Sequence, residues 1–110
     1  MSIRKKKSAA MVFLDRLIGK PLTLGGFIEA IRLGEEMTQV EFAELLGVSR
    51  SYLCDIEKGR KVVSPEKARE YAKKLGYSQS QFVRLAFQDQ LTKMGMKYEV
   101  HLERSAKKAA

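Results

Sequence analysis

The chain has 110 residues, of which 45% are hydrophobic and 31% charged, so a folded single domain is expected rather than a disordered chain. Its longest apolar run, residues 9–14, is far too short to span a bilayer, and the charges of Asp15 and Arg16 argue against a signal peptide. A single cysteine excludes an internal disulfide and is typical of a reducing cytoplasm, which is the expected location.

The net charge of +8 predicts a polyanionic partner, although most of this charge lies at the two ends of the chain. Residues 4–7 and 104–108 supply all but one of the net positive charges. Inside the body the charges are segregated: residues 29–49 carry a net charge of −4, whereas residues 50–74 carry +4. The basic region therefore begins at residue 50.

The first 21 residues contain a basic arm and a helical pattern. Residues 1–7 are predicted to be a disordered arm, which either follows DNA phosphates or a minor groove or remains a solvated tail. Residues 8–18 place apolar side chains on one helical face and end before Gly19 and Pro21. This extra helix is expected to pack on the domain or on a second subunit.

The next helix is predicted to begin after Thr23, a favourable N-cap. Its inward positions are Leu24, Phe27, Ile28 and Ile31. The pair Gly25–Gly26 lacks the wider glycine pattern and the preceding strand of a phosphate-binding loop. We expect it to permit close backbone packing instead.

Residues 38–60 form the organising segment of the chain, and their pattern predicts two short helices joined by a tight turn. Gly47 suits the left-handed conformation that ends a helix, and two residues later Ser49 is a natural N-cap. Leu53 and Ile56 face inward on the second helix. This layout is typical of a helix-turn-helix, whose second helix can enter a DNA major groove.

The segment closely resembles the helix-turn-helix of lambda-repressor-like, Cro-type (Xre family) regulators. The residues that carry the resemblance are Thr38-Gln39, Phe42-Ala43, Leu46-Gly47-Val48-Ser49, Leu53, Ile56-Glu57 and Gly59. With a first helix before the motif and a fourth after it, the resemblance covers residues 22–87. It implies that Arg32 pairs with Glu57 between the first and third helices, away from DNA, which we expect to be a structural role.

Two further helices are expected after the motif. Ser64, Pro65 and Glu66 supply a cap, a first-turn proline and an acid at the positive end of the helix dipole, and Gly76 ends that helix. Ser78 begins the second, which continues to about residue 94. The fold class is therefore all-α, a helix-turn-helix bundle over residues 8–94 with the motif at 38–59.

The spacing of apolar residues changes at residues 96–103, where apolar and polar side chains alternate strictly. This pattern predicts a short C-terminal β-strand within residues 95–103. A lone strand needs a partner, so we expect it to pair with a second subunit or with another protein. Residues 104–110 are predicted to be a disordered tail.

The resemblance places Gln39 at the start of the second helix and Ser49, Arg50, Ser51 and Asp55 on the outer face of the third. Arg50 is the candidate for a bidentate contact to guanine, and Asp55 either accepts from a cytosine amine or pairs with a lysine on the protein surface. Gln39 either donates its amide to a phosphate or steadies a neighbouring base-contacting residue. Ser51 is expected to contact bases through water. The predicted DNA-binding residues are Gln39, Ser49, Arg50, Ser51, Tyr52, Asp55, Lys58, Arg60 and Lys61, of which Tyr52, Lys58, Arg60 and Lys61 are assigned to phosphates.

Residues with catalytic or metal-binding chemistry are sparse and scattered. His101 is the single histidine and is too isolated for a triad or a metal site. Cys54 lacks a nearby histidine and a second cysteine, so we interpret it as a small residue near the protein–DNA surface. The sequence therefore predicts no enzyme activity, no metal and no cofactor.

Three functions are compatible with this pattern. The first is a dimeric DNA-binding transcriptional regulator, a repressor that occupies an inverted-repeat operator. The second is an antitoxin, in which the same DNA-binding domain accompanies a segment that binds a protein toxin. The third, an RNA-associated or coactivator module of the same fold, is disfavoured because stacking aromatic residues on a sheet are missing.

Overall fold

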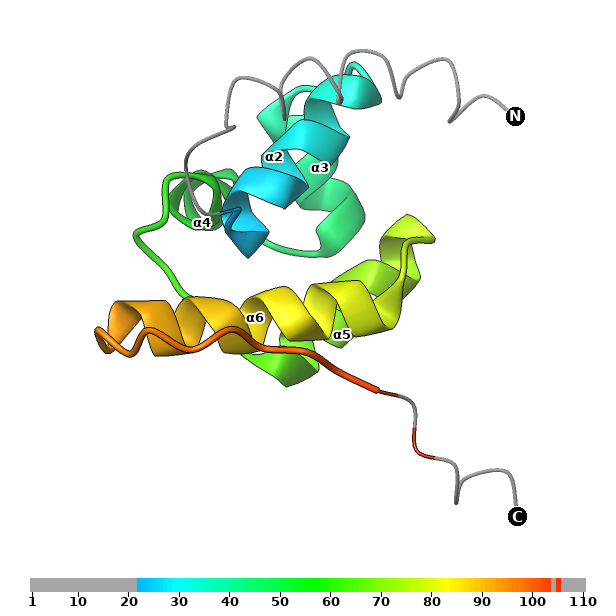
Figure 1. The fold of residues 1–110 in the computed structure, drawn as a ribbon. Helices are drawn as coiled ribbons and strands as arrows, with labels where there is room; N and C mark the ends of the chain where they lie inside the picture. Colours follow the sequence, from blue (N-terminus) through cyan, green and yellow to red (C-terminus); the bar gives the residue numbers. More distant parts are fainter. Residues whose placement is uncertain (1–21, 104, 106–110) are drawn as a thin grey trace.

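The computed structural model describes residues 22–103 and residue 105, and five helices follow one another in this part of the chain (Figure 1). They are α2 (Leu24–Gly34), α3 (Gln39–Leu46), α4 (Arg50–Glu57), α5 (Pro65–Leu75) and α6 (Gln79–Lys93). The predicted helical bundle is confirmed over these residues. The predicted arm (1–7), the predicted helix (8–18) and residues 104 and 106–110 of the predicted tail lie outside the described residues.

Each helix begins at a serine or threonine whose hydroxyl satisfies a free backbone amide. The caps are Thr23, Thr38, Ser49, Ser64 and Ser78, and each hydroxyl accepts a hydrogen bond from the amide three residues further along the chain. Glu41 completes a capping box at Thr38 by accepting from the Thr38 amide. The helix boundaries are thus set locally, by residues whose chemistry is visible in the sequence.

The hydrophobic core is drawn from all five helices. Phe42, Leu53, Ile28 and Phe82 are each 0% exposed, and they belong to α3, α4, α2 and α6. Tyr71 joins them from α5. One continuous core therefore holds the two helices of the motif against the rest of the bundle, so the motif is presented rigidly rather than as a flexible hairpin.

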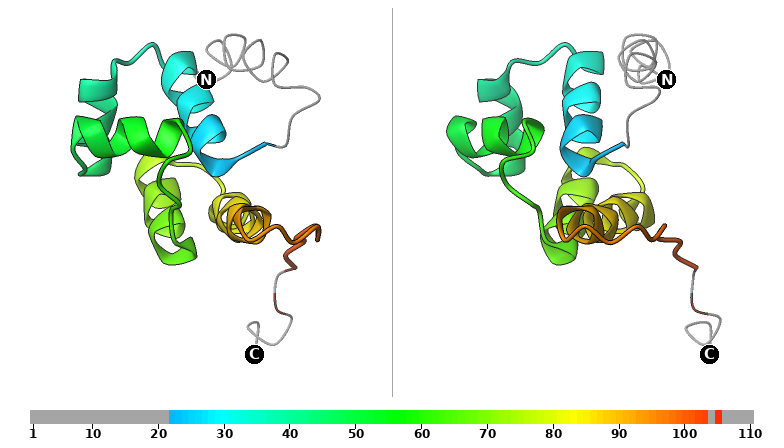
Figure 2. Two further views of the ribbon diagram at one scale, coloured as in Figure 1. Left: turned by 90° about the vertical axis from the view of Figure 1, so that its left-hand side faces the viewer. Right: turned by 60° about the vertical axis from the view of Figure 1, so that its left-hand side comes forward.

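Two groups of helices pack on each other. The helices α2, α3 and α4 cluster together, whereas α5 and α6 form a pair against them (Figures 1 and 2). Where α2 meets α4, Gly25 faces the backbone, and a Cβ added there would clash with the carbonyl oxygen of Ile56. The expectation of close backbone packing is confirmed at Gly25, because only hydrogen fits between these two helices.

The predicted C-terminal β-strand is wrong. Residues 96–103 are not assigned to a strand; after Gly95, which has a φ of 78°, the chain turns back and runs alongside α6 (Figure 1). The Gln88 side chain of α6 donates to the Tyr98 carbonyl and accepts from the Val100 amide, both at 2.8 Å. The Gln88 side-chain amide thus makes the two hydrogen bonds that one residue of a neighbouring strand would make. The segment is held beside α6 in this way, without a β-ladder.

Candidate nucleic-acid interface

Helix α4 has a buried side and an outer side, which the sequence spacing separates. Leu53, Ile56 and Glu57 are buried. Ser51 and Lys58 are exposed on the opposite side, and Arg50 is exposed at the start of the helix. Because residues three and four apart share a helix face, Ser51, Asp55 and Lys58 form one continuous outer surface of α4.

The turn between α3 and α4 is held by several contacts. Gly47 adopts a φ of 78°, the left-handed conformation expected of it, and the Val48 amide donates to the Ala43 carbonyl at 2.9 Å. Lys74 of α5 donates from Nζ to the Leu46 carbonyl at 3.0 Å. The Ala43, Glu44 and Leu46 carbonyls near the end of α3 therefore accept hydrogen bonds, and the start of α4 is fixed relative to α3 and α5.

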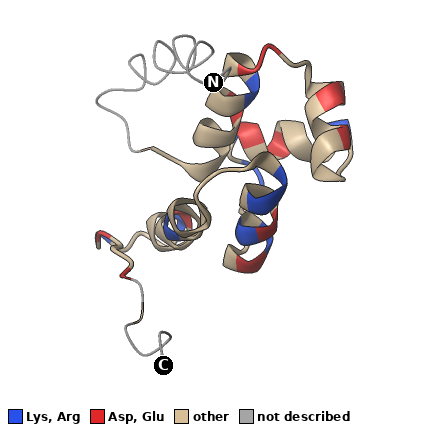
Figure 3. Ribbon diagram, turned by 90° about the vertical axis from the view of Figure 1, so that its right-hand side faces the viewer, with Lys and Arg blue, Asp and Glu red and all other residues tan. Residues whose placement is uncertain are grey.

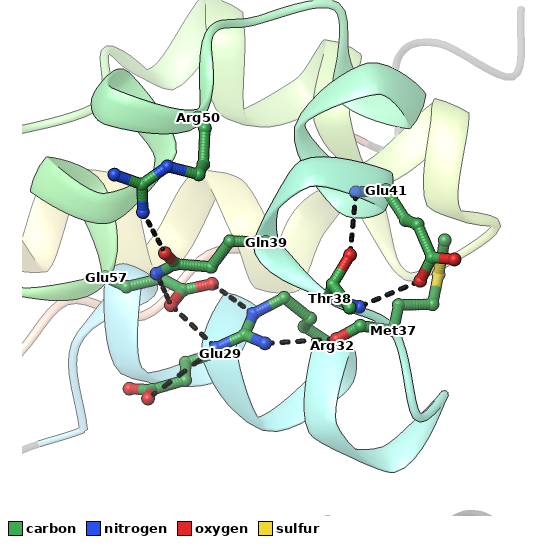
Figure 4. A network of polar contacts seen from close by, with 8 residues as sticks. All are labelled: Glu29, Arg32, Met37, Thr38, Gln39, Glu41, Arg50 and Glu57. Carbon is green, nitrogen blue, oxygen red and sulfur yellow. Dashed lines mark hydrogen bonds and ion pairs between the residues drawn. The ribbon is translucent and has the colours of Figure 1, made fainter.

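A buried ion pair lies behind α4 and is confirmed as the resemblance implied. Arg32 Nε donates to Glu57 Oε2 at 2.8 Å, and Arg32 Nη2 donates to Glu57 Oε1 at 3.1 Å (Figure 4). The side chains are 12% and 2% exposed. Arg32 also donates from Nη1 to the Met37 carbonyl at 3.0 Å. The pair ties α2, α4 and the α2–α3 turn together on the inner side of α4.

Glu29 lies at the edge of this pair, with its Oε2 atom 4.0 Å from Arg32 Nη2. Burial, and then the Glu57 carboxylate, raise the pKa of Glu29 above its ordinary value, although Arg32 and Lys58 act in the opposite direction. Glu29 is thus a weaker partner of Arg32 than Glu57 is, and it extends the network toward solvent rather than toward the outer side of α4.

Gln39 links the buried pair to the outer side of α4. Its Nε2 atom donates to Glu57 Oε1 at 3.0 Å, and its Oε1 atom accepts from Arg50 Nη1 at 2.9 Å (Figure 4). Gln39 is half-buried, whereas Arg50 is exposed. The first residue of α3 and the first residue of α4, both predicted to contact DNA, are therefore in direct contact with each other.

Asp55 and Arg60 form a second polar contact on the outer side. Arg60 Nε donates to Asp55 Oδ1 at 2.9 Å, and Arg60 Nη2 lies 3.8 Å from Cys54 Sγ. The hydrogen bond and the charge of Asp55 raise the pKa of the Arg60 guanidinium. Of the two alternatives for Asp55, the structure contains a surface ion pair, but with an arginine after the helix rather than with a lysine.

The other predicted DNA-binding residues surround these two contacts. The Ser49 hydroxyl caps α4 by accepting from the Tyr52 amide at 3.0 Å. Tyr52 is half-buried and packs against the core. Lys58 and Lys61 are exposed on the turn that follows α4. Cys54 is half-buried on α4 itself, beside the predicted DNA-contacting residues.

Positive charge continues from this turn onto α5. Segments coloured for lysine and arginine recur along α5, with two acidic residues between them, whereas acidic residues occupy the turn between α2 and α3 (Figure 3). The segregation predicted from the sequence is therefore present in three dimensions. A polyanion that approaches the α4–α5 side meets a favourable field, and one that approaches the α2–α3 turn meets repulsion.

Glu57 is the residue whose part in the site the sequence reasoning missed, since it was assigned only to the pair with Arg32. A signal was present: a buried carboxylate needs donors for both oxygens. Gln39, at the start of the neighbouring helix, supplies one of them. Among the described residues, no cluster of metal-ligating side chains is found, and no helix combines the length and hydrophobicity needed to cross a membrane.

Comparison with known proteins identifies the same segment. A family model described as helix-turn-helix matches residues 28–81. The immunity repressor protein of Bacillus phage phi105 is 51% identical over 39 residues, which are 36% of this chain and 27% of that protein. The chain thus spans only about a quarter of that relative's length. No solved structure matches this chain significantly.

The matched residues include α3, the turn, α4 and α5. They also contain every contact described above between α3, α4 and the loop that follows. Residues 28–81 therefore match a helix-turn-helix family, and the domain that they form is similar to that of lambda-repressor-like, Xre-type regulators.

Proposed function

We propose that the protein is a DNA-binding transcriptional regulator, a repressor that acts in the cytoplasm by occupying its operator. The observation that carries this proposal is the outer side of α4, where Arg50 and Ser51 are exposed while Leu53, Ile56 and Glu57 anchor the helix. An α-helix fits the major groove of B-DNA, and polar side chains on its outer side can then meet base edges.

Arg50 and Asp55 are the residues assigned to bases. An arginine can donate two hydrogen bonds to O6 and N7 of guanine, and an aspartate can accept from the N4 amine of cytosine. Asp55 must first leave Arg60, to which it is bound at 2.9 Å. Because that pair lies at the protein surface, with side chains that are 61% and 31% exposed, its opening costs little free energy. Arg60 is then released to meet a phosphate.

The remaining residues of the interface are assigned to the DNA backbone. Lys58, Arg60 and Lys61 lie in sequence at the end of α4, where they can flank the groove that α4 enters. Ser49 and Tyr52 lie at the other end of α4, and Ser51 is short enough to contact a base through water. Such contacts fix the orientation of the protein but carry little sequence information.

We also propose that the protein binds as a symmetric dimer. Phe87, Leu91 and Met94 share one face of α6, and Phe87 and Met94 are 41% and 61% exposed. Met96 and Tyr98, on the segment that runs alongside α6, are also exposed. An exposed apolar surface of this kind is typical of an interface. A two-fold dimer would require an inverted-repeat operator with half-sites about one helical turn, roughly 34–36 Å, apart.

Sedimentation of the parent and of the Met94→Asp variant tests the dimer, since a charge on this apolar face opposes its burial. The variant is expected to be monomeric at concentrations at which the parent is dimeric. A parent chain that binds a single operator half-site as a monomer would contradict the dimer. The apolar surface would then have to serve another protein, as the antitoxin hypothesis requires.

Two variants test the DNA-binding assignment, with DNA recovered from a random pool by the parent chain as the target. Arg50→Ala is expected to cost ~1–3 kcal/mol of binding free energy and to relax preference at one base position. Lys61→Ala is expected to weaken binding to all sequences alike and to reduce the salt slope by about one unit. Arg69→Ala, which removes an exposed arginine of α5 that bonds Gln79, is the control for loss of a guanidinium.

The result that overturns the direct contact is an Arg50→Ala variant that loses affinity without any change in base preference. A parent chain that recovers no preferred sequence from the pool would overturn the proposed function itself.

A further inference from the structure

The Arg60 side chain lies back over α4, although the residue belongs to the loop that follows this helix. Its Nε atom donates to Asp55 Oδ1 at 2.9 Å, and its Nη2 atom lies 3.8 Å from Cys54 Sγ. Both contacts direct the guanidinium to residues of α4. While the pair is closed, the charges of Arg60 and Asp55 offset each other, so together they offer little net charge to a phosphate.

The loop backbone is held independently of this side-chain pair. The Asp55 carbonyl accepts from the Arg60 amide at 2.8 Å and from the Lys61 amide at 3.2 Å. Gly59 supplies the positive φ of 80° that reverses the chain at this point. Opening of the pair therefore leaves the loop in place, and only the Arg60 side chain, which is 61% exposed, has to turn.

The group that replaces Arg60 on Asp55 must be a hydrogen-bond donor, because an ionised carboxylate has only acceptor atoms. In the major groove, cytosine presents its N4 amine and adenine its N6 amine, whereas guanine and thymine present acceptors and a methyl group. Which of these groups stands opposite Asp55 depends on the base sequence. Where no amine stands there, an open Asp55 would face acceptor atoms and the negative charge of the DNA, so the closed pair is favoured.

We propose that Asp55 and Arg60 form a sequence-dependent latch, in which Arg60 binds a phosphate only where Asp55 binds a base amine. The inference rests on the proposed function. The two contacts are made together or not at all, so the chain gains both on a fitting sequence and forfeits both on any other. A phosphate contact, which carries no sequence information of its own, thereby contributes to discrimination.

Two variants separate the members of the latch. Asp55→Ala releases Arg60 on every sequence, and Arg60→Ala removes the phosphate contact that depends on Asp55. Both variants retain the backbone hydrogen bonds of the loop, so the fold is expected to survive, which circular dichroism checks. Glu70→Ala is the matched control for Asp55→Ala. Glu70 lies 3.6 Å from Lys67 in an exposed ion pair of α5, so its removal also deletes one acid and releases one cation.

Binding of the full chain and its variants is measured over a range of salt concentrations, on the DNA recovered from a random pool and on a scrambled sequence. Arg60→Ala is expected to lower the salt slope by about one unit on the recovered sequence and by much less on the scrambled one. Lys61→Ala is expected to lower both slopes alike, as for an ordinary phosphate contact.

Asp55→Ala is expected to relax preference at one base position and to tighten binding to the scrambled sequence, because Arg60 then meets a phosphate there as well. One additional phosphate contact raises the salt slope by about 0.9, so this gain in affinity should shrink by about threefold to fourfold between roughly 50 and 200 mM salt. Glu70→Ala is expected to leave base preference unchanged, and any gain in its affinity should be the same on the two sequences.

Three outcomes overturn the inference. One is a loss of salt slope in Arg60→Ala that is equal on the two sequences, because Arg60 would then contact a phosphate whatever base Asp55 meets. Another is an Asp55→Ala variant that binds the scrambled sequence no more tightly than the parent does. The third is a gain in Asp55→Ala that equals that of Glu70→Ala on both sequences, which is the effect of charge alone. If the parent chain itself shows no base preference, the proposed function fails as well, so the two failures are distinguishable.

Discussion

Replacement of Arg32 by alanine is expected to destabilise the fold by ~3 kcal/mol. The Arg32 side chain is 12% exposed and donates three hydrogen bonds, two to Glu57 and one to the Met37 carbonyl. Its removal leaves a carboxylate that is 2% exposed with only the Gln39 amide as a partner. Loss of one partner of a buried pair costs about 3–5 kcal/mol, and we expect the lower end because Gln39 remains.

Urea denaturation followed by circular dichroism measures this loss of unfolding free energy. In thermal denaturation, the melting temperature is expected to fall by more than about 10 °C. Arg69→Ala is the matched control, since it removes an exposed arginine with one hydrogen bond, to Gln79, and should cost less than about 1 kcal/mol. The double variant Arg32→Met with Glu57→Met should recover stability, because a buried pair replaced by apolar side chains is often neutral.

The reasoning fails if Arg32→Ala is as stable as Arg69→Ala, or if the double variant is no more stable than Arg32→Ala. An Arg32→Ala variant with unchanged stability but no DNA binding would place Arg32 among the DNA contacts instead.

Two further predictions concern α2. Gly25→Ala should cost about 1–3 kcal/mol, because the added Cβ meets the Ile56 carbonyl and forces α2 from α4; an unchanged melting temperature would contradict this. Asp89 of α6 accepts from the Leu24 amide at 3.0 Å, and burial raises its pKa above 3.8. The folded state therefore holds this proton more tightly, and stability is lost as the pH rises through the raised pKa. Asp89→Asn should be more stable than the parent at neutral pH, with the difference vanishing in acid; a less stable variant at neutral pH would refute it.

The helix-turn-helix could be predicted from the sequence because its determinants are local. A serine or threonine cap, a glycine able to adopt positive φ and apolar residues at helical spacing each act within a few residues of their own position. Ser49 and Gly47 behave in the structure as their residue types dictate. Leu53 and Ile56 determine which face of α4 is buried, and helix geometry then determines which residues lie on its outer side.

The C-terminal segment shows where local patterns are insufficient. Alternation of apolar and polar residues indicates an extended chain with one face on a surface, but it does not specify that the surface is a sheet. Here the neighbour is α6, and Gln88 satisfies Tyr98 and Val100. The pattern also overstates burial, since Tyr98 is 70% exposed. A strand requires a partner ladder, and no partner is encoded within the segment itself.

The partner of Asp55 was missed for a geometric reason. On a helix, the neighbours of a side chain are the residues three or four positions away, so Lys58 is the ion-pair partner that the sequence favours for Asp55. The helix ends there, and Gly59, with a φ of 80°, reverses the chain so that Arg60 returns over Asp55. Contacts that cross the end of a helix depend on the conformation of the loop, which residue spacing alone does not give.

The charges within α4 suggest how specificity and affinity are divided. Arg50 is balanced by Asp55 on the outer side, and Glu57 is neutralised by Arg32 behind it. The helix assigned to base recognition therefore contributes little net attraction to a polyanion. Attraction must come from flanking cations such as Arg60 and Lys61, and from the basic residues at the two ends of the chain. Where the base sequence does not suit Arg50 and Asp55, Asp55 stays paired with Arg60, and neither of these two carries a favourable contact to the DNA. A near-neutral recognition helix between basic flanks thus favours discrimination between sequences over indiscriminate binding.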